Sequence, residues 1–299
     1  MIVVFGSINL DLVATVALLP NAGETLIARS LSMSPGGKGA NQALAARRAG
    51  SSVAMYGAIG RDAFSDAALA LLREDGVDLS GVRVVDGATG IALIHVDADG
   101  ENAITVAAGA NASAVANCVP DDKLDASTTL VMQLEVPIAE VRSLACRAHA
   151  AGSRVILNAA PAQSLSPSLL HCVDVLIVNE TEARTAPSSL GFPSNPEAFV
   201  KAYRSHFGRD AIVSLGAQGV VASSASATIR LPAPKTTIVD TIGAGDALVG
   251  ALASALDRNV PWRRALAEGV AAGTLACTKA GAQPSMPQQR EIAALADFI

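Results

Sequence analysis

Short apolar runs alternate with helix-like segments along most of this chain, and that alternation restricts its fold more than any other feature. The apolar runs predict strands at residues 2–7, 53–59, 129–134, 154–157, 173–178 and 211–215. The intervening and following segments predict helices at residues 39–50, 63–75, 138–151, 244–257 and 262–279. Strands that are apolar along their whole length need cover on both faces. We therefore expect an α/β fold, with a mainly parallel sheet flanked by helices, in a single domain over residues 1–299.

Two regions, residues 12–33 and 89–107, are strand-like but contain no helix-like segment. The second region is expected to form a hairpin with its turn at Ala98, Asp99 and Gly100. A few strands without helices cannot cover both faces of their sheet, so they must lie over the main domain, a ligand or another subunit. Residues 187–196 are rich in Ser, Pro and Gly and are expected to form a surface loop.

Composition excludes several classes of protein. The 299 residues carry a net charge of −5 without a block of Lys or Arg, which argues against a nucleic-acid partner. With 51% hydrophobic and 16% charged residues, the chain can bury a core and is not of the disordered type. No apolar stretch approaches the ~18 residues of a membrane-spanning helix. The apolar start lacks a basic segment and soon reaches Asp11, so we expect no signal peptide, no membrane partner and a cytoplasmic location.

The cysteines and histidines show no metal-binding pattern. The four histidines lack metal-ligand spacing. The four cysteines are far apart, have no C-x-x-C motif and are expected to be reduced thiols: Cys118, Cys146, Cys172 and Cys277.

Three common motifs are absent. The first strand runs into Gly6-Ser-Ile-Asn-Leu-Asp11, which lacks the glycine pattern of a dinucleotide-binding turn. Gly36-Gly-Lys-Gly39 is not a Walker A motif, because Gly39 stands where Ser or Thr should follow the lysine. No G-x-S-x-G nucleophile elbow occurs in the sequence.

The string Asp240-Thr-Ile-Gly-Ala-Gly-Asp246 comes immediately before an Ala-rich helix. Its small residues allow a ligand to approach the backbone, and the free N–H groups of a helix N-terminus favour an anion such as a phosphoryl group. Asp246 at this helix end is a candidate general base for an attacking hydroxyl. The alternative is an Asp N-cap after a glycine turn, which the second aspartate at position 240 makes less favourable.

Other polar residues lie next to predicted strand ends. Asn9 and Asp11 point to the same side of an extended chain and suit the hydroxyls of a polyol, although an Asx turn is an alternative. Residues 35–41 form a glycine-rich loop that ends at Asn41, which is either a ligand contact or part of a helix cap. Asn179 and Glu182 follow an apolar run and suit Mg²⁺ waters and phosphate, or form a capping pattern.

Together these segments resemble the ribokinase family of carbohydrate kinases over nearly the whole chain. The resemblance rests on seven segments, which occur in the family's order: Gly6–Asp11, Gly36–Ala43, Met132–Glu135, Asn179–Glu182, Leu215–Gly219, Asp240–Asp246 and Lys279–Ser285. The Asp-Thr-x-Gly-Ala-Gly-Asp string is specific for the wider superfamily. Gly-Gly-Lys-Gly-Ala-Asn-Gln-Ala combined with Gly-Ala-Gln-Pro-Ser narrows the resemblance to the ribokinases.

The resemblance implies a role for each matching position. Asp246 resembles the catalytic base, and Gly243, Ala244 and Gly245 the anion hole beside it. The implied sugar contacts are Asn9, Asp11, Gly37, Lys38, Gly39, Ala40, Asn41, Glu135 and Asp246. The implied nucleotide and Mg²⁺ contacts are Asn179, Glu182, Ser214, Leu215, Gly216, Ala217, Gln218, Gly219 and Gly245. The implied monovalent-cation (K⁺) site is Asp240, Ile242, Ala276, Lys279, Gly281 and Ser285, several through backbone carbonyls. Residues 12–33 and 89–107 resemble a β-sheet lid that often pairs across a homodimer.

Two positions depart from the family pattern. Val270 stands where relatives commonly carry Asn or His near the nucleotide, and Ser214 replaces a common Thr. The implied activity is ATP-dependent phosphorylation of the 5-hydroxyl of D-ribose to give D-ribose 5-phosphate. A kinase of the same family for another sugar or a nucleoside is the nearer alternative. A non-catalytic sugar-binding protein is the more distant one, and the intact Asp246 disfavours it.

Overall fold

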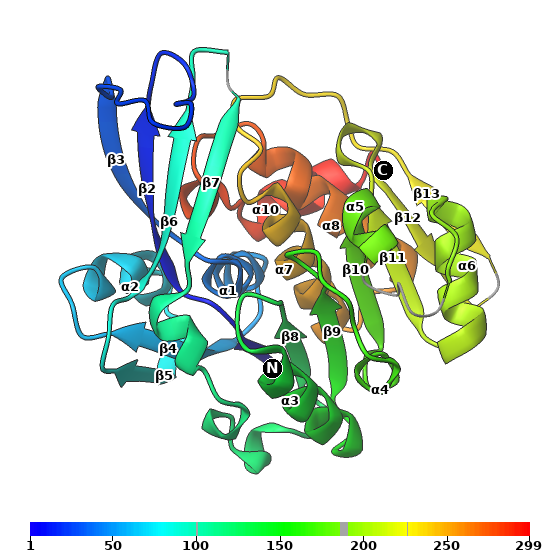
Figure 1. Ribbon diagram of the computed structural model, residues 1–299. Helices are drawn as coiled ribbons and strands as arrows, with labels where there is room; N and C mark the ends of the chain where they lie inside the picture. Colours follow the sequence, from blue (N-terminus) through cyan, green and yellow to red (C-terminus); the bar gives the residue numbers. More distant parts are fainter. Residues whose placement is uncertain (100, 186–190, 226) are drawn as a thin grey trace.

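The computed structural model describes residues 1–99, 101–185, 191–225 and 227–299 (Figure 1). Gly100 of the expected hairpin turn, and residues 187–190 of the expected surface loop, therefore lie outside the described residues. Within the described part, two sheets share the chain. A large sheet flanked by helices forms the body of the molecule, and a small sheet stands at the upper left of Figure 1.

The large sheet has nine strands, of which seven are parallel. In spatial order they are β13 (Thr228–Leu231), β12 (Val220–Ser223), β11 (Asp210–Ser214), β10 (Val175–Asn179), β9 (Arg154–Asn158), β8 (Thr129–Met132), β1 (Ile2–Phe5), β4 (Val53–Gly60) and β5 (Asp78–Val85). β12 and β13 pair antiparallel at one edge. The central strands β1, β4 and β8 are buried along their whole length, which is why they appear as continuous apolar runs in the sequence.

Helices cover both faces of the large sheet, as the sequence predicts. One hydrophobic core lies against α1 (Lys38–Arg48), α2 (Ser65–Glu74), α7 (Ala244–Asp257), α8 (Trp262–Ala276) and α10 (Gln289–Ala296). The core on the other face involves α3 (Ile138–Ala150), α4 (Pro167–Leu170), α5 (Glu180–Thr185) and α6 (Pro196–Phe207). A short helix, α9 (Ala282–Ser285), follows α8. The predicted helix 262–279 ends earlier, at Ala276.

The small sheet is built from the two helix-free regions. Its strand order is β3 (Ser30–Gly36), β2 (Asn9–Thr15), β6 (Gly90–Val96) and β7 (Asn102–Ala107). The central pair β2–β6 is parallel, and the outer pairs are antiparallel. The chain passes from β1 into β2 through only three residues, so Asn9 and Asp11 lie at the junction of the two sheets.

The cysteines do not all behave as expected. Cys146 on α3 and Cys172 before β10 form a disulfide, with 5.2 Å between their Cα atoms. The expectation of four reduced thiols is therefore wrong, because the fold brings together two cysteines that are 26 residues apart in sequence. Cys118 and Cys277 are free. None of the described helices is long and apolar enough to span a membrane.

Candidate active site

The predicted site residues meet at the carboxyl ends of the parallel strands. Polar residues follow each of five strands there: Asn9 after β1, Gln133 and Glu135 after β8, Asn158 at the end of β9, Asn179 at the end of β10, and Ser214 at the end of β11. In an open parallel sheet, ligands bind beyond these strand ends. The N-termini of α1 and α7 arrive at the same edge, so backbone N–H groups and side chains share one site.

Asp246 lies in the first turn of α7 and is 6% exposed. The preceding Gly243 has φ 78°, and a β-carbon there would lie 2.9 Å from the Cα of Ala282, so this turn requires glycine. Both carboxylate oxygens of Asp246 accept amide hydrogen bonds. Asn41 donates to Oδ2 at 2.9 Å, and Gln42 donates to Oδ1 at 2.8 Å. The carboxylate is therefore held in a single orientation by two neighbouring residues of α1.

Charged groups cluster around Asp246. Burial raises the pKa of the Asp246 carboxyl, while Lys38 and the two amide donors oppose the increase. Burial, Glu135 and Asp246 together raise the pKa of Asp11 to about 7. Burial alone would lower the pKa of the Lys38 ammonium, but the surrounding carboxylates raise it. Strongly shifted carboxyls beside a lysine are typical of a catalytic site.

The predicted sugar contacts form a connected polar wall. Asn111 donates to Oδ1 of Asn9 at 2.7 Å and accepts from the backbone N–H of Ile8 at 2.9 Å, which fixes the Asn9 amide. Glu135 Oε2 accepts from the Ser7 hydroxyl at 2.6 Å and from the Lys38 backbone N–H at 3.1 Å. Glu135 thereby contacts the glycine-rich loop directly, and Asn9 and Asp11 lie against glycines of the same loop.

The glycine-rich loop packs directly on the end of β1. Gly37 has φ 86°, and a β-carbon there would lie 2.7 Å from the backbone nitrogen of Asn9. A side chain on Gly36 would collide with the Asp11 carboxylate, at 2.2 Å. The loop therefore owes its glycines to close contact with the strand end and with Asp11. Asn41, which follows it, has a buried Oδ1 without a hydrogen-bond partner, a free acceptor for a hydroxyl.

Two adjoining cavities open beside Asp246. A cavity of about 230 Å³ is lined by Lys38, Asn158, Asn179, Glu182 and Asp246, among others. A larger one, of about 560 Å³, is mainly apolar and is lined by Ala233, Val270, Cys277 and others. Four residues line both cavities: Ser214, Thr241, Gly245 and Leu248. The two cavities therefore join at the N-terminus of α7, whereas the predicted sugar contacts Asn9, Asp11, Asn41 and Glu135 line neither of them.

The predicted nucleotide residues divide between the two cavities. Gly216, Ala217 and Gly219 line the larger cavity, and Val270 contributes an apolar side chain to its wall. Leu215 and Gln218 do not line it; the Leu215 N–H donates to Gly219 O, and Gln218 accepts from Arg230. Asn179 and Glu182 form a reciprocal pair, each backbone N–H donating to the other's side chain at 2.8 Å. The capping alternative is thus also present, and Glu182 lines the smaller cavity as well.

The two segments of the predicted cation site are in contact. Asp240 accepts from the N–H of Ile242 at 2.9 Å and from the N–H of Gly281 at 2.8 Å. Ser285 is buried and donates to Ala282 O, and Ala276 is buried nearby in sequence. Lys279 is exposed, and its ammonium lies 3.7 Å from a Glu291 oxygen. No cluster of three or more His, Cys, Asp or Glu suited to a metal occurs in the described part of the chain.

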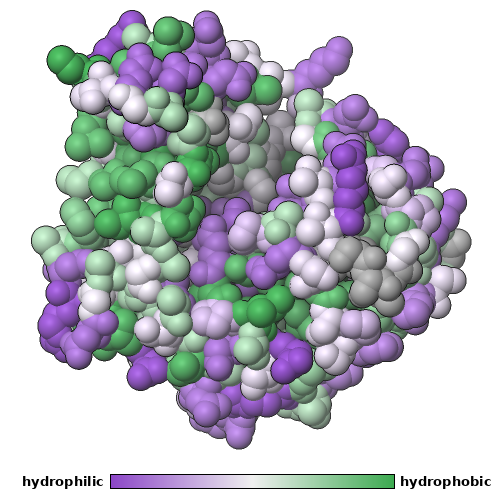
Figure 2. Space-filling model, in the orientation of Figure 1, coloured by the Kyte–Doolittle hydropathy of each residue, from purple (hydrophilic) through white to green (hydrophobic). Residues whose placement is uncertain are grey.

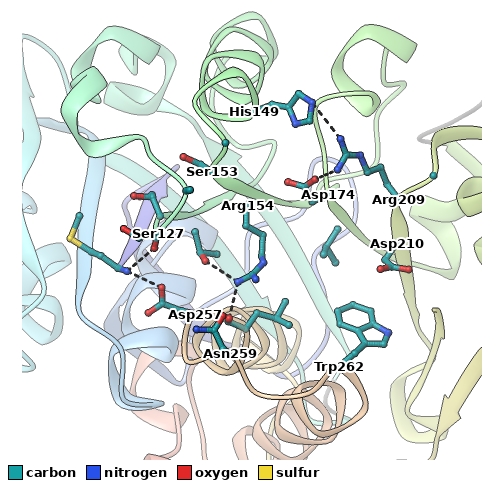
Figure 3. A pocket seen from close by; sticks show the side chains of 18 of the residues that line it. Ser127, His149, Ser153, Arg154, Asp174, Arg209, Asp210, Asp257, Asn259 and Trp262 are labelled. Atoms are coloured by element: carbon teal, nitrogen blue, oxygen red, sulfur yellow. Dashed lines mark hydrogen bonds and ion pairs between the residues drawn. The ribbon is translucent and has the colours of Figure 1, made fainter. Parts of the chain in front are cut away.

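A still larger cavity, of about 1010 Å³, opens at the opposite edge of the sheet (Figure 3). Its wall includes Leu256 and Asp257 at the end of α7, about 16 Å along that helix from Asp246. Its three carboxylates are already paired: Asp257 with the N-terminal amine, Asp174 with Arg209, and Asp210 with Arg204. Arg154 donates to Leu256 O. These ion pairs stabilise the ends of strands and helices and contain no nucleophile beside an anion site.

Sequence reasoning missed five residues of the site. Ser7, Gln42, Asn111, Gln133 and Asn158 orient other polar groups through hydrogen bonds. One signal was available for Gln42 and Gln133, because each is a polar side chain inside an otherwise apolar segment. Asn111 gives no such signal, since it lies in a short helical turn far from the other site residues in sequence.

The fold and site define a small-molecule kinase, with a buried carboxylate at a helix N-terminus between two adjoining cavities. Comparison with known proteins specifies the family. The sequence matches the pfkB family of carbohydrate kinases over residues 1–289. It is 36% identical over 296 residues to the ribokinase of Lactococcus lactis, covering 97% of this chain and 95% of that protein. It is 32% identical over 298 residues to the deoxyribokinase of Salmonella typhi, covering 96% of this chain and 95% of that protein.

Structural comparison agrees. The ribokinase of Arabidopsis thaliana, solved in complex with ribose and ATP, superposes with a TM-score of 0.89 at 29% identity, over 100% of this chain and 99% of that one. The chain belongs to the pfkB family of carbohydrate kinases, and within it to the ribokinase type.

Proposed function

We propose that this kinase transfers the γ-phosphoryl group of ATP to the 5-hydroxyl of D-ribose, giving D-ribose 5-phosphate and ADP. The observation that carries the proposal is the position of Asp246. Its carboxylate is buried, is oriented by Asn41 and Gln42, and faces the cavity where a small polyol and a nucleotide meet. The names of its ribokinase relatives support the choice of ribose.

Asp246 acts as general base in this proposal. Its carboxylate accepts the proton of the 5-hydroxyl while the hydroxyl oxygen forms a bond to the γ-phosphorus and the bond to the ADP oxygen breaks. Burial raises the pKa of Asp246 and so makes it a stronger base than an exposed aspartate. The N–H group of Gly245, at the start of α7, then stabilises the charge on the transferring group, beside the N–H of Ala244, which donates to Thr241 O at 3.3 Å.

The ribose hydroxyls are bound by the polar wall at the sheet junction. Asn41 offers its unpartnered Oδ1, Asn9 and Glu135 offer oxygens that Asn111 and Ser7 hold in place, and Asp11 offers a buried carboxylate. Buried groups that pair with hydroxyls reject analogues lacking them, since an unpaired polar group is costly. Gly37, Lys38, Gly39 and Ala40 bring the loop backbone to the same wall.

ATP occupies the larger cavity, with its adenosine part against the apolar wall that includes Val270. Asn179 and Glu182 then lie beside the phosphates in the smaller cavity. Mg²⁺ is commonly held by one or two carboxylates together with phosphate oxygens and water. Glu182 fits this role because its buried carboxylate lines the smaller cavity, and a cation bound there would offset the burial that raises its pKa. When bound, Mg²⁺ neutralises phosphate charge.

A monovalent cation binds between the turn at Asp240–Ile242 and the segment Gly281–Ser285. The hydrogen bond from the Gly281 N–H to Asp240 already connects the two segments. Both segments are rich in small residues, which leave carbonyl oxygens accessible. A carbonyl-rich site with one carboxylate suits a large, weakly hydrated ion better than Mg²⁺.

The small sheet acts as a lid and as a homodimer surface. Leu31 and Met33 on β3 are 68% and 63% exposed, and Leu93 on β6 is exposed beside them. By strand register these side chains lie on the face opposite Asp11. Hydrophobic residues gather over this sheet in Figure 2, and a second copy of the chain would bury them. A cytoplasmic site of action follows from the use of ATP.

The experiment is ADP release with Mg-ATP and a panel of acceptors: D-ribose, 2-deoxy-D-ribose, D-fructose and adenosine. We expect the highest kcat/KM with ribose. A preference for 2-deoxyribose would instead support the second candidate function, a kinase of the same family for another sugar. The similarity to a deoxyribokinase favours this alternative. No ADP release with any acceptor, combined with tight ribose binding, would support a non-catalytic sugar-binding protein.

A further inference from the structure

Gln42 is saturated with hydrogen bonds inside the site. It lies on α1 with 0% exposure, and its Nε2 donates to Oδ1 of Asp246 at 2.8 Å and to Oδ1 of Asn158 at 3.1 Å. Its Oε1 accepts from Nε2 of Gln133 at 2.7 Å. Both amide hydrogens are therefore used, and the carbonyl oxygen is capped.

The neighbouring Asn41 differs in one respect. It also donates to Asp246, but its buried Oδ1 has no partner. A side chain with an unused buried acceptor is ready to bind a ligand, whereas one whose groups are all engaged acts on its partners. The two amides that hold Asp246 thus have different functions. Asn41 keeps one acceptor unused, whereas every polar group of the Gln42 side chain is engaged by the protein.

Asp246, Asn158 and Gln133 together determine which way the Gln42 amide points. If the Gln42 amide were flipped, its oxygen would face the oxygens of Asp246 and Asn158, and its NH₂ group would face that of Gln133. Three repulsive contacts would replace three hydrogen bonds. Gln133 Oε1 has no hydrogen-bond partner among the described residues, and it occupies the space that a β-carbon on Gly6 would fill, at 1.9 Å. The series of hydrogen bonds from Gln133 through Gln42 to Asp246 therefore has one favourable arrangement.

We propose that Gln42, held in register by Gln133, is the positioning residue that fixes the Asp246 carboxylate for attack by the acceptor hydroxyl. Neither glutamine lines either of the two cavities beside Asp246. The inference rests on the proposed role of Asp246 as general base. Its effect is expected in the turnover step and not in ribose binding, because Asn41 and the polar wall are untouched.

The pH dependence gives a second readout. The hydrogen bond from Gln42 lowers the pKa of Asp246, as do the Asn41 amide and the Lys38 ammonium, whereas burial and Glu135 raise it. Asp11 and Glu182 are the other carboxyls coupled electrostatically to Asp246. Loss of the Gln42 amide therefore raises the pKa of Asp246 further. More of the enzyme is then protonated at a given pH, and the acid limb of the kcat profile moves to higher pH.

The test uses Gln42→Met and Gln133→Met, which keep the approximate length of each side chain but remove its amide. We expect Gln42→Met to lower kcat by about 10–100-fold, with KM for ribose changed less than about threefold. Gln133→Met should have a smaller effect in the same direction. The double variant should be no slower than Gln42→Met alone, since Gln133 acts only through Gln42.

Ser254→Ala is the matched control. Ser254 is also fully buried on α7 and connects α7 to α1, through bonds to Ala49 O and the Ser51 hydroxyl at the far end of the helix pair. The substitution removes buried hydrogen bonds that connect α7 to the C-terminal end of α1, far from Asp246. We expect a lower Tm in this variant, with the acid limb of kcat unmoved.

Wild-type turnover is measured first, and its absence would contradict the proposed function itself. With an active wild type, an unchanged kcat and acid limb in Gln42→Met would overturn the positioning role. Equal and additive losses in the two glutamine variants would do the same. If Gln42→Met does not fold, Gln133→Met decides the question. A lower kcat with a shifted acid limb supports the proposal, and wild-type behaviour overturns it.

Discussion

Asp240 and Gly281 are joined by a 2.8 Å hydrogen bond from the Gly281 N–H to Oδ2 of Asp240, across 41 positions of sequence. The other carboxylate oxygen accepts from Ile242 in the turn that leads to Asp246. One side chain therefore connects the segment after α8 to the turn that leads to Asp246, the proposed catalytic base. A ligand that orders residues 281–285 would therefore also affect the N-terminus of α7, through Asp240.

This connection predicts a dependence on monovalent cations. Turnover with K⁺ should exceed turnover with Na⁺ or Li⁺ at equal ionic strength, because an ion held between the two segments would order the anion-binding turn before reaction. Asp240→Ala should lower turnover and remove the difference between the salts. Steady-state assays at fixed Mg²⁺ with the chloride salt varied provide the measurement. Equal rates in K⁺, Li⁺ and tetramethylammonium would show that no such site operates.

Asp246→Asn tests the general base. Asn keeps the shape of the side chain but cannot accept the hydroxyl proton, so kcat should fall by at least ~10²-fold. Ribose affinity, measured by calorimetry, should change far less, since the sugar hydroxyls are held mainly by other residues. Near-normal turnover of the purified variant would remove Asp246 from its proposed role.

Asp11→Ala tests the acceptor pocket. The variant should have a strongly raised KM for ribose and reduced discrimination between ribose and 2-deoxyribose, because a pocket group that pairs with a hydroxyl is lost. The measurement is kcat/KM for both sugars in wild type and variant. If the KM and the ratio are both unchanged, Asp11 does not bind the sugar.

Asp11 also predicts how stability varies with pH. Its pKa rises from 3.8 to about 7 in the fold, so the unfolded chain has the lower pKa. The folded state then binds more protons than the unfolded state between these values, and the ionised group destabilises the fold as pH rises through about 7. Asp11→Asn removes this penalty. Its Tm relative to wild type should increase from pH 5 to pH 8, and a difference that stays constant across this range would contradict the burial of an ionisable Asp11.

The parts of the site that the sequence predicts are those carried by short motifs. Asp246 and Asn41 each follow glycines that allow a close ligand approach, and such local chemistry is visible in a linear pattern. Gln42 stands beside Asn41, but its function depends on Gln133, which lies 91 positions away, and only the fold shows that the two meet. The Cys146–Cys172 pair escaped prediction for the same reason.

The strands of the large sheet also differ in how well the sequence predicts them. The central strands β1, β4 and β8 are buried on both faces and are easily predicted as apolar runs. β5 is an edge strand with exposed positions, so it lacks a continuous apolar run and was not predicted. β13 is the strand at the other edge of this sheet and is largely unburied, so it lacks a continuous apolar run in the same way.

The last prediction concerns the outer face of the small sheet. Met33 pairs in register with Leu12, on the face opposite Asp11, and is 63% exposed. If a second copy covers this face, a lysine there places a charge in an apolar contact and should convert dimers to monomers.

Val84→Lys is the control, because Val84 is 56% exposed on β5, at the edge of the large sheet. Light scattering after size exclusion, at matched concentrations, measures the change. We expect a dimer for the wild type and for Val84→Lys and a monomer for Met33→Lys, with kcat/KM for ribose reduced in the monomer because the lid strands lose their support. A monomeric wild type would contradict the dimer, and a dimeric Met33→Lys would place the interface elsewhere.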